Sequence, residues 1–135
     1  MQIIGFNLNK ISIERKEKQQ GKLEIKQNIN IDDISEDKIN ISDKEIVKVS
    51  FTFSVNYSPD FAKVELKGQI VLLPEKEELK DILKEWKKKQ ISEKFRIPLF
   101  NFIMGKCNIK ALSLEEELNL PLHVPMPRIS PKKEE

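Results

Sequence analysis

The sequence predicts an α+β domain, in which a four-stranded antiparallel sheet is followed by two C-terminal helices packed on one of its faces. Apolar and polar residues alternate in four segments of the first half, which is typical of half-buried strands. The second half has the i, i+3, i+4, i+7 apolar spacing of helices. Because strands and helices are segregated along the chain, the pattern favours α+β over alternating α/β. The 135 residues suit one domain, which we place at 1–129, with a polar tail at 130–135.

The first two predicted strands lie between Ile4 and Ile13 and between Leu23 and Ile31. The alternation in the first strand slips by one residue, so we expect a bulge or a strong twist near Asn9–Lys10. The acidic segment Asp32–Lys44 is expected to form a crossover loop, with a short helical turn or an extra strand inside it.

The third strand has the most regular pattern, with six apolar residues alternating without error between Val47 and Tyr57. A turn at Ser58–Asp60 separates it from a fourth strand, Phe61–Leu73. Strands this close in sequence are expected to pair as a hairpin.

Two helices are expected after Pro74. The first has an apolar stripe at Leu79, Ile82, Leu83 and Trp86, with acids at its start and lysines at its end. The second is expected to begin at Pro98 and to end before Pro121. Its buried face is predicted to contain Phe100, Ile103, Cys107, Ala111, Leu114 and Leu118, and the acids Glu115–Glu117 are expected on an exposed flank.

The same helix has a second apolar strip, which we call the outer strip: Phe102, Gly105, Ile109 and Leu112. Gly105 in mid-helix costs about 1 kcal/mol relative to alanine, and close approach of another backbone would explain it. We therefore predict that the outer strip contacts another copy of the protein. The alternative is that the first helix and the C-terminal segment cover it within one subunit.

The segment after the second helix must be extended, because Pro121, Pro125 and Pro127 prevent a helix there. Its apolar residues are expected to lie on a surface: Leu120, Leu122, Val124, Met126 and Ile129.

Composition excludes several classes of protein. The 24 basic and 22 acidic residues are interspersed, which argues against a nucleic-acid partner. No apolar run approaches the roughly 20 residues of a membrane-spanning helix, so no membrane insertion is expected. A single cysteine allows no internal disulfide and, with no signal-peptide pattern at the first residues, favours the cytoplasm.

The sequence contains few residues that are typical of a catalytic site. His123 and Cys107 are the sole residues of their types. Cys107 falls on the buried face of the second helix, where thiols are inert, and His123 lies between two apolar residues, where a packed or surface role is expected. There is no His/Cys cluster for a metal and no glycine-rich phosphate loop. We expect no enzyme, no metal site and no cofactor.

The layout resembles that of SecB, the export chaperone, and particularly its archaeal SecB-like relatives. The resemblance rests on the first strand, IIGFNLNKISIE, on the order of four strands and then helices, and on a long helix that runs into ELNLPLHVPMPRI. It covers most of the chain, from Met1 to Ile129.

This resemblance implies a homo-oligomer, a dimer or a tetramer, that holds unfolded polypeptides without ATP, in the service of protein export or of another pathway. Our candidates for a client-binding groove are Trp86, Phe102, Leu120, Leu122, Val124 and Met126. Two departures stand out. The link between the first two strands is short and polar, and Lys10 occupies a position where the family has an acid that docks the motor SecA, so SecA docking is not expected.

Two other functions stay open. The first alternative to a chaperone is a dedicated subunit that protects one partner, such as an antitoxin. The second is a small enzyme or ligand carrier with a pocket between the sheet and the helices, around His123.

Overall fold

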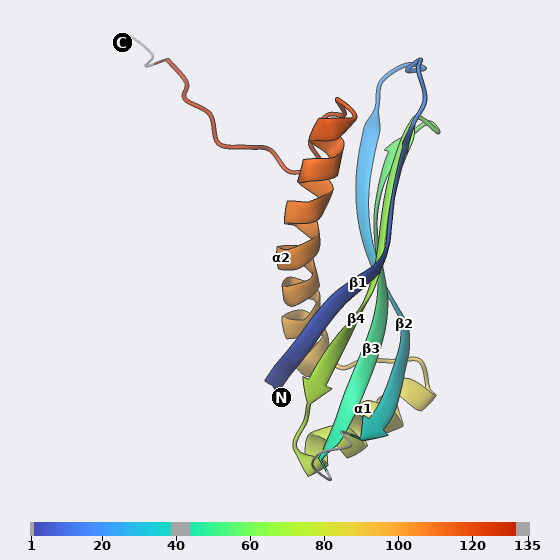
Figure 1. Ribbon diagram of the computed structural model, residues 1–135, viewed down its shortest axis with the longest axis vertical. Coiled ribbons are helices and arrows are strands. Elements are labelled where there is room, and N and C mark those ends of the chain that lie inside the picture. Colours follow the sequence, from blue (N-terminus) through green and yellow to red (C-terminus); the bar gives the residue numbers. More distant parts are fainter. Residues whose placement is uncertain (1, 39–43, 132–135) are drawn as a thin grey trace.

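The chain forms four long strands followed by two helices (Figure 1). The computed structural model describes residues 2–38 and 44–131. The strands are β1 (Gln2–Arg15), β2 (Glu24–Lys38), β3 (Glu45–Ser58) and β4 (Ala62–Leu73), and the helices are α1 (Lys76–Lys87) and α2 (Glu93–Glu117).

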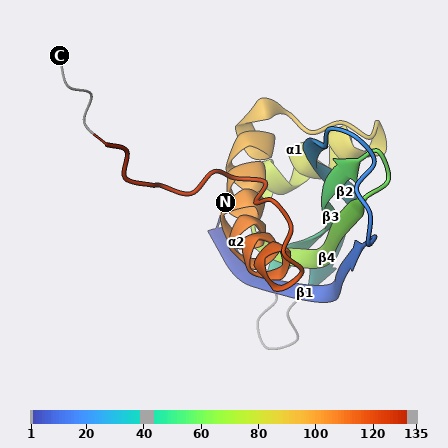
Figure 2. The ribbon, with the colours of Figure 1, turned by 90° about the horizontal axis from the view of Figure 1, so that it is seen from above.

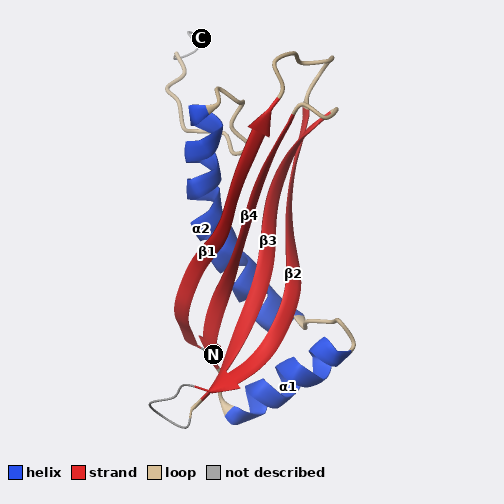
Figure 3. Ribbon diagram, turned by 45° about the vertical axis from the view of Figure 1, so that its right-hand side comes forward, coloured by secondary structure: helices blue, strands red, loops and turns tan. Residues whose placement is uncertain are grey.

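The strands make one antiparallel sheet in the order β1-β4-β3-β2. Both helices lie on the same side of the sheet, with α2 running along it and α1 across one end (Figures 2 and 3). The α+β prediction is therefore confirmed, as is the β3–β4 hairpin.

The core lies between the sheet and α2. The alternation in β3 turns Val47, Val49, Phe51, Phe53, Val55 and Tyr57 inward, and each is at most 1% exposed. Alternate residues of β4 join them, from Val64 to Leu72. The remaining faces of these strands are polar, so one side of the sheet faces solvent.

Gly68 is required where β1, β3 and β4 come together. A Cβ atom at this position would lie 2.5 Å from the Asn7 carbonyl oxygen and 2.8 Å from the Phe51 ring. Backbone cannot yield as a flexible side chain can, so only glycine allows this close approach.

The expected irregularity in β1 is present. The pairing with β4 skips Asn9, which confirms the predicted bulge, and a second shift leaves Ile4 unpaired nearer the N-terminus. Each extra residue restores the inward phase for the apolar residues beyond it.

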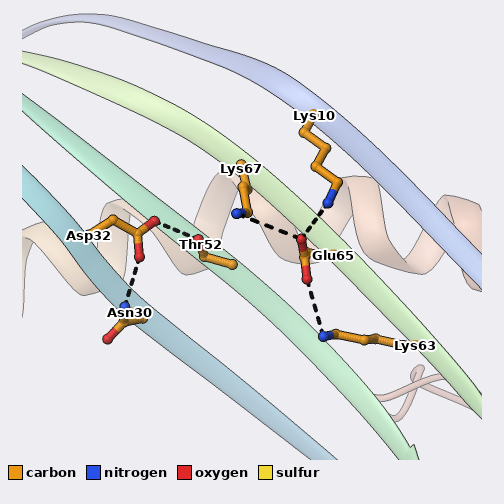
Figure 4. Close-up of polar contacts among 7 residues, drawn as sticks. All are labelled: Lys10, Asn30, Asp32, Thr52, Lys63, Glu65 and Lys67. Carbon is orange, nitrogen blue, oxygen red and sulfur yellow. Dashed lines mark hydrogen bonds and ion pairs between the residues drawn. The ribbon is translucent and has the colours of Figure 1, made fainter.

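β2 is longer than predicted, because it pairs with β3 through Lys38. The expected loop from Asp32 was therefore wrong over its first half, and residues 39–43 lie outside the described part of the chain. The acids that suggested a loop face solvent at a sheet edge. Asp32 is the extra residue of a bulge, and its carboxylate accepts hydrogen bonds from Asn30 (2.8 Å) and Thr52 (2.5 Å) (Figure 4).

α2 begins at Glu93, earlier than predicted, and Pro98 lies inside it. Pro98 removes one backbone donor, yet the turn before it holds because Phe95 is buried and the Phe95 N–H donates to the Ser92 carbonyl. Tertiary packing thus outweighs the local preference for a break.

The fully buried line of α2 differs from the predicted face. It contains Phe95, Leu99, Ile103, Cys107, Ala111 and Glu115. Ile103, Cys107 and Ala111 were predicted correctly, whereas Phe100, Leu114 and Leu118 are only half-buried. Glu115 was expected in solvent and is 0% exposed, so that prediction was wrong.

Beyond α2 the chain is extended up to residue 131 (Figure 1). Leu120 turns back into the core and is 5% exposed, while Ile129 is fully exposed. The predicted tail at 130–135 is described only through residue 131, and residues 132–135 lie outside the described part.

Candidate functional site

A cleft of about 810 Å³ lies between β2 and the connection from α1 to α2. We call it the β2 cleft. Its apolar residues are Ile29, Ile31, Trp86, Ile91 and Phe100, and all five are half-buried. Its polar residues are Asn30, Asp32, Glu85, Lys89, Gln90, Ser92 and Arg96.

Three elements position this cleft. Trp86 lies in the last turn of α1, Ile91 in the connection, and Phe100 two turns into α2. The connection is fixed by the Glu85 carboxylate, which accepts the Ser92 N–H at 3.0 Å. Trp86 and Phe100 form what we call the aromatic floor of the cleft, and they come from two different helices.

The ring of Trp86 is partly covered by a cation. The Lys89 ammonium lies 4.5 Å from the centre of the Trp86 ring, within the range of a cation–π interaction. Lys89 has a long solvent-exposed side chain, so it can leave the ring when an apolar group takes its place.

One wall of the cleft is a sheet edge. Among the described residues, β2 pairs with β3 alone, so its other side carries backbone groups without a strand partner there. The cleft residues Ile29–Asp32 belong to this edge. An extended polypeptide lying here can combine strand pairing with apolar burial.

A second cleft, of about 980 Å³, lies on the other side of α1, against the ends of the strands. Six of its eleven residues are charged: Glu36, Lys44, Glu45, Glu75, Lys76 and Lys80. Its apolar residues are aliphatic, namely Leu73, Pro74, Leu79 and Leu83, and it has no aromatic residue.

The predicted client-binding residues do not form one surface. Trp86 lies in the β2 cleft at one end of α2. Leu120, Leu122, Val124 and Met126 follow the other end of α2, a helix of 25 residues or about 37 Å. Leu120 is buried, Val124 is half-buried, and Leu122 and Met126 are 37% and 58% exposed.

Phe102 lies on neither of these surfaces. Its ring packs edge-on against Phe6 of β1, with 5.7 Å between ring centres. It is half-buried, and so is Leu112, another member of the outer strip. The remaining two members are open: Ile109 is 73% exposed, and a Cβ atom on Gly105 would have no neighbour within 4 Å.

His123 does not couple with Cys107. Its ring is hydrogen-bonded to Glu115, with 2.7 Å between Nδ1 and Oε2, and to Asn108, with 2.8 Å between Nε2 and Oδ1. Burial raises the pKa of the Cys107 thiol to about 11, which keeps it protonated and unreactive. The His123 side chain is 1% exposed, so no substrate reaches it as the structure stands.

The solvent-facing side of the sheet is polar and holds an ion-pair group (Figure 4). Glu65 lies 2.7 Å from the Lys10 ammonium, 3.2 Å from that of Lys63 and 4.0 Å from that of Lys67. Lys10 and then Lys63 hold the pKa of Glu65 below its usual range. The side chains in this group are charged, so the group offers no apolar contact to an unfolded chain.

Neither helix is long and apolar enough to cross a membrane. In the described part of the chain, no three His, Cys, Asp or Glu side chains are grouped to hold a metal ion.

The fold is similar to that of the SecB-like chaperone Rv1957 of Mycobacterium tuberculosis, solved in complex with a ChAD peptide from the antitoxin HigA1 (Rv1956). The TM-score is 0.53 at 14% sequence identity, over 96% of this chain and 87% of the other. No protein-family model matches the chain, and no curated protein matches it.

Proposed function

We propose that this protein is a cytoplasmic SecB-like chaperone that binds extended segments of non-native polypeptide in the β2 cleft. The observation that carries the proposal is the meeting of two half-buried aromatic side chains, Trp86 and Phe100, with a sheet edge that lacks a strand partner. An unfolded chain presents the complementary chemistry, namely exposed apolar side chains and a backbone with free hydrogen-bonding groups.

Such binding needs no nucleotide, because apolar burial and strand pairing are both reversible contacts. The solved neighbour was determined in complex with a peptide from another protein, which supports a polypeptide as the ligand class. Identifying the polypeptides that bind would show whether the protein has one client or many, and whether those clients are exported.

Trp86 provides a direct test, since it is the one tryptophan in the chain. Adding an unstructured peptide rich in Phe, Leu and Ile is expected to shift Trp86 emission to the blue, because the bound peptide removes water from the ring. A peptide with those residues replaced by serine should cause no shift. If neither peptide changes the emission while the first one binds, the β2 cleft is not the site.

Removing the aromatic floor should remove most of the affinity. The double variant Trp86→Ala/Phe100→Ala is expected to bind a fluorescently labelled apolar peptide at least about 30-fold more weakly, which corresponds to about 2 kcal/mol for truncated aromatic anchors. Ile97→Ala is the control, since it truncates an apolar side chain that is exposed on α2 but belongs neither to the β2 cleft nor to the outer strip. An equal loss in the control and in the double variant would contradict the assignment of the site to the β2 cleft.

The same client experiment separates the alternatives. Protection of several unrelated unfolded proteins from aggregation indicates a general holding chaperone. Tight binding of one partner alone indicates a dedicated subunit of the antitoxin-protecting type. A well-folded sample that protects no client and binds no peptide would end the proposal.

We further propose that the outer strip of α2 contacts a second copy. The support is its exposure: Ile109 is the most exposed apolar side chain of α2, and the backbone around Gly105 is open to close approach. Two helices that cross at a glycine can bring their backbones together, which would offset the cost of Gly105 in mid-helix.

Solution mass by light scattering tests this interface. The unmodified protein is expected to be a dimer or larger, and Ile109→Lys should shift it towards monomer by placing a charge in an apolar contact. Ile97→Lys is the matched control, because Ile97 is exposed on α2 but lies outside the outer strip. A monomeric unmodified protein, or equal effects of both substitutions, would contradict the interface.

A further inference from the structure

The end of α2 and the segment that follows it are joined by a buried polar group. Glu115 is 0% exposed and the His123 side chain is 1% exposed. The Glu115 carboxylate accepts the His123 backbone N–H at 2.9 Å and lies 2.7 and 2.9 Å from Nδ1 of the ring. One carboxylate thus holds both the backbone and the side chain of one residue.

Both nitrogens of the His123 ring face oxygen atoms of other side chains. Nδ1 faces a carboxylate and Nε2 faces the Asn108 side-chain oxygen at 2.8 Å, so both ring nitrogens meet acceptors. In the described part of the chain, His123 is the ion-pair partner of Glu115, and a buried carboxylate without a cation would be costly. A neutral ring with its proton on Nδ1 would require the Asn108 amide to turn over and present its nitrogen.

The other groups around His123 do not change charge with it. Tyr57 of β3 donates to the Pro121 carbonyl at 2.6 Å, and burial, with a contribution from Glu115, raises its pKa, so the phenol stays protonated. Arg15 of β1 donates to the Leu118 carbonyl at 2.6 Å and keeps its charge throughout. Phe53 meets the imidazole edge-on at 6.1 Å and carries no charge.

The segment from Leu118 to Val124 therefore has two side-chain attachments that do not change with pH, at Arg15 and at Tyr57, and one that depends on a proton, at His123. We infer that His123 is a protonation-dependent latch, which fastens this segment over the end of α2 as an imidazolium between Glu115 and Asn108 and loosens it when the proton leaves. Loosening uncovers the edge of the core at Phe53, whose ring meets the imidazole. The inference is independent of the proposed client binding.

The direction of the pH effect follows from the charges. On the acidic side of the imidazole titration the ion pair is intact and the segment is held. On the alkaline side Glu115 stays buried without a cation, so the segment is held less firmly.

A single histidine makes the test direct. Nitrogen-15 NMR of the imidazole between about pH 5 and pH 9 reports its protonation, because histidine titrates in this range. Hydrogen exchange at the backbone N–H of Leu120 and of His123 reports the segment, since the first donates to the Glu115 backbone carbonyl and the second to the Glu115 carboxylate. After correction for the intrinsic pH dependence of exchange, the protection of both amides is expected to fall roughly tenfold or more over the pH interval in which the ring loses its proton.

Two results would overturn the latch. One is a ring that is neutral while both amides are strongly protected. The other is a ring that loses its proton with no change in protection.

A pair of asparagine substitutions tests the same point without removing the histidine. Asn108→Asp places a carboxylate against Nε2 and is expected to move the loss of protection to higher pH by about one unit or more. Asn101→Asp makes the same change at an exposed site on α2 and should leave the midpoint in place. Equal shifts in both variants, or no shift in Asn108→Asp, would show that the ring and Asn108 do not act together.

Discussion

Replacing His123 by leucine is expected to lower the free energy of unfolding by about 3–5 kcal/mol, because it leaves the Glu115 carboxylate buried without a cation. A second substitution distinguishes charge from packing. Adding Glu115→Gln removes the charge and keeps an oxygen for the backbone N–H of residue 123, so the double variant should regain about 2 kcal/mol or more. Urea unfolding followed by circular dichroism measures both values.

If the two substitutions simply add, so that the double variant is less stable than His123→Leu, then the histidine matters for its volume and not for its charge. The comparison requires equal urea dependence of the unfolding free energy in all variants, which shows that the denatured states are alike.

Gly68→Leu is expected to cost about 3 kcal/mol or more, and a variant that does not fold meets the same expectation. The first side-chain carbon alone would lie 2.5 Å from the Asn7 oxygen, so β1 would have to separate from β4. Gly68→Ala should show a smaller cost with the same cause. Gly5→Ala is the control, since a Cβ atom there would lie 3.4 Å from Val71, an ordinary contact.

The change in stability for Gly5→Ala should stay within about 1 kcal/mol, the range of strand preferences. If Gly68→Ala is as well tolerated as Gly5→Ala, the close approach of β1 to β4 at this point is not a constraint on the fold.

The sheet could be predicted from the sequence because its signal is local. In β3 each residue reports its own side of the sheet, and the β1 bulge at Asn9 is visible as a break in that pattern. The ends of elements were harder. β2 continues through its acidic residues because an edge strand tolerates charge, and α2 continues through Pro98 because burial of Phe95 and Leu99 supports the helix on both sides of it.

The candidate site could be predicted only in part. Trp86 stood out as the one tryptophan, but Ile31, Ile91 and Phe100 join it through tertiary packing that no local pattern reports. Glu115 was missed for a similar reason: it follows an apolar face at helical spacing, but its partner lies eight residues away, after the helix has ended. The single histidine within a proline-rich apolar segment was the available signal for that pair.

The bulges have a consequence for how the protein avoids joining itself into larger sheets. Its sheet has two edges, each a strand of 14 or 15 residues, long enough to recruit another strand in continuous register. Each edge is interrupted, at Ile4 and Asn9 in β1 and at Asp32 in β2, where the extra residue breaks the regular spacing of backbone donors and acceptors. An incoming strand can therefore pair over only a short run on either edge, which permits a brief, reversible addition and opposes the open-ended stacking of identical chains.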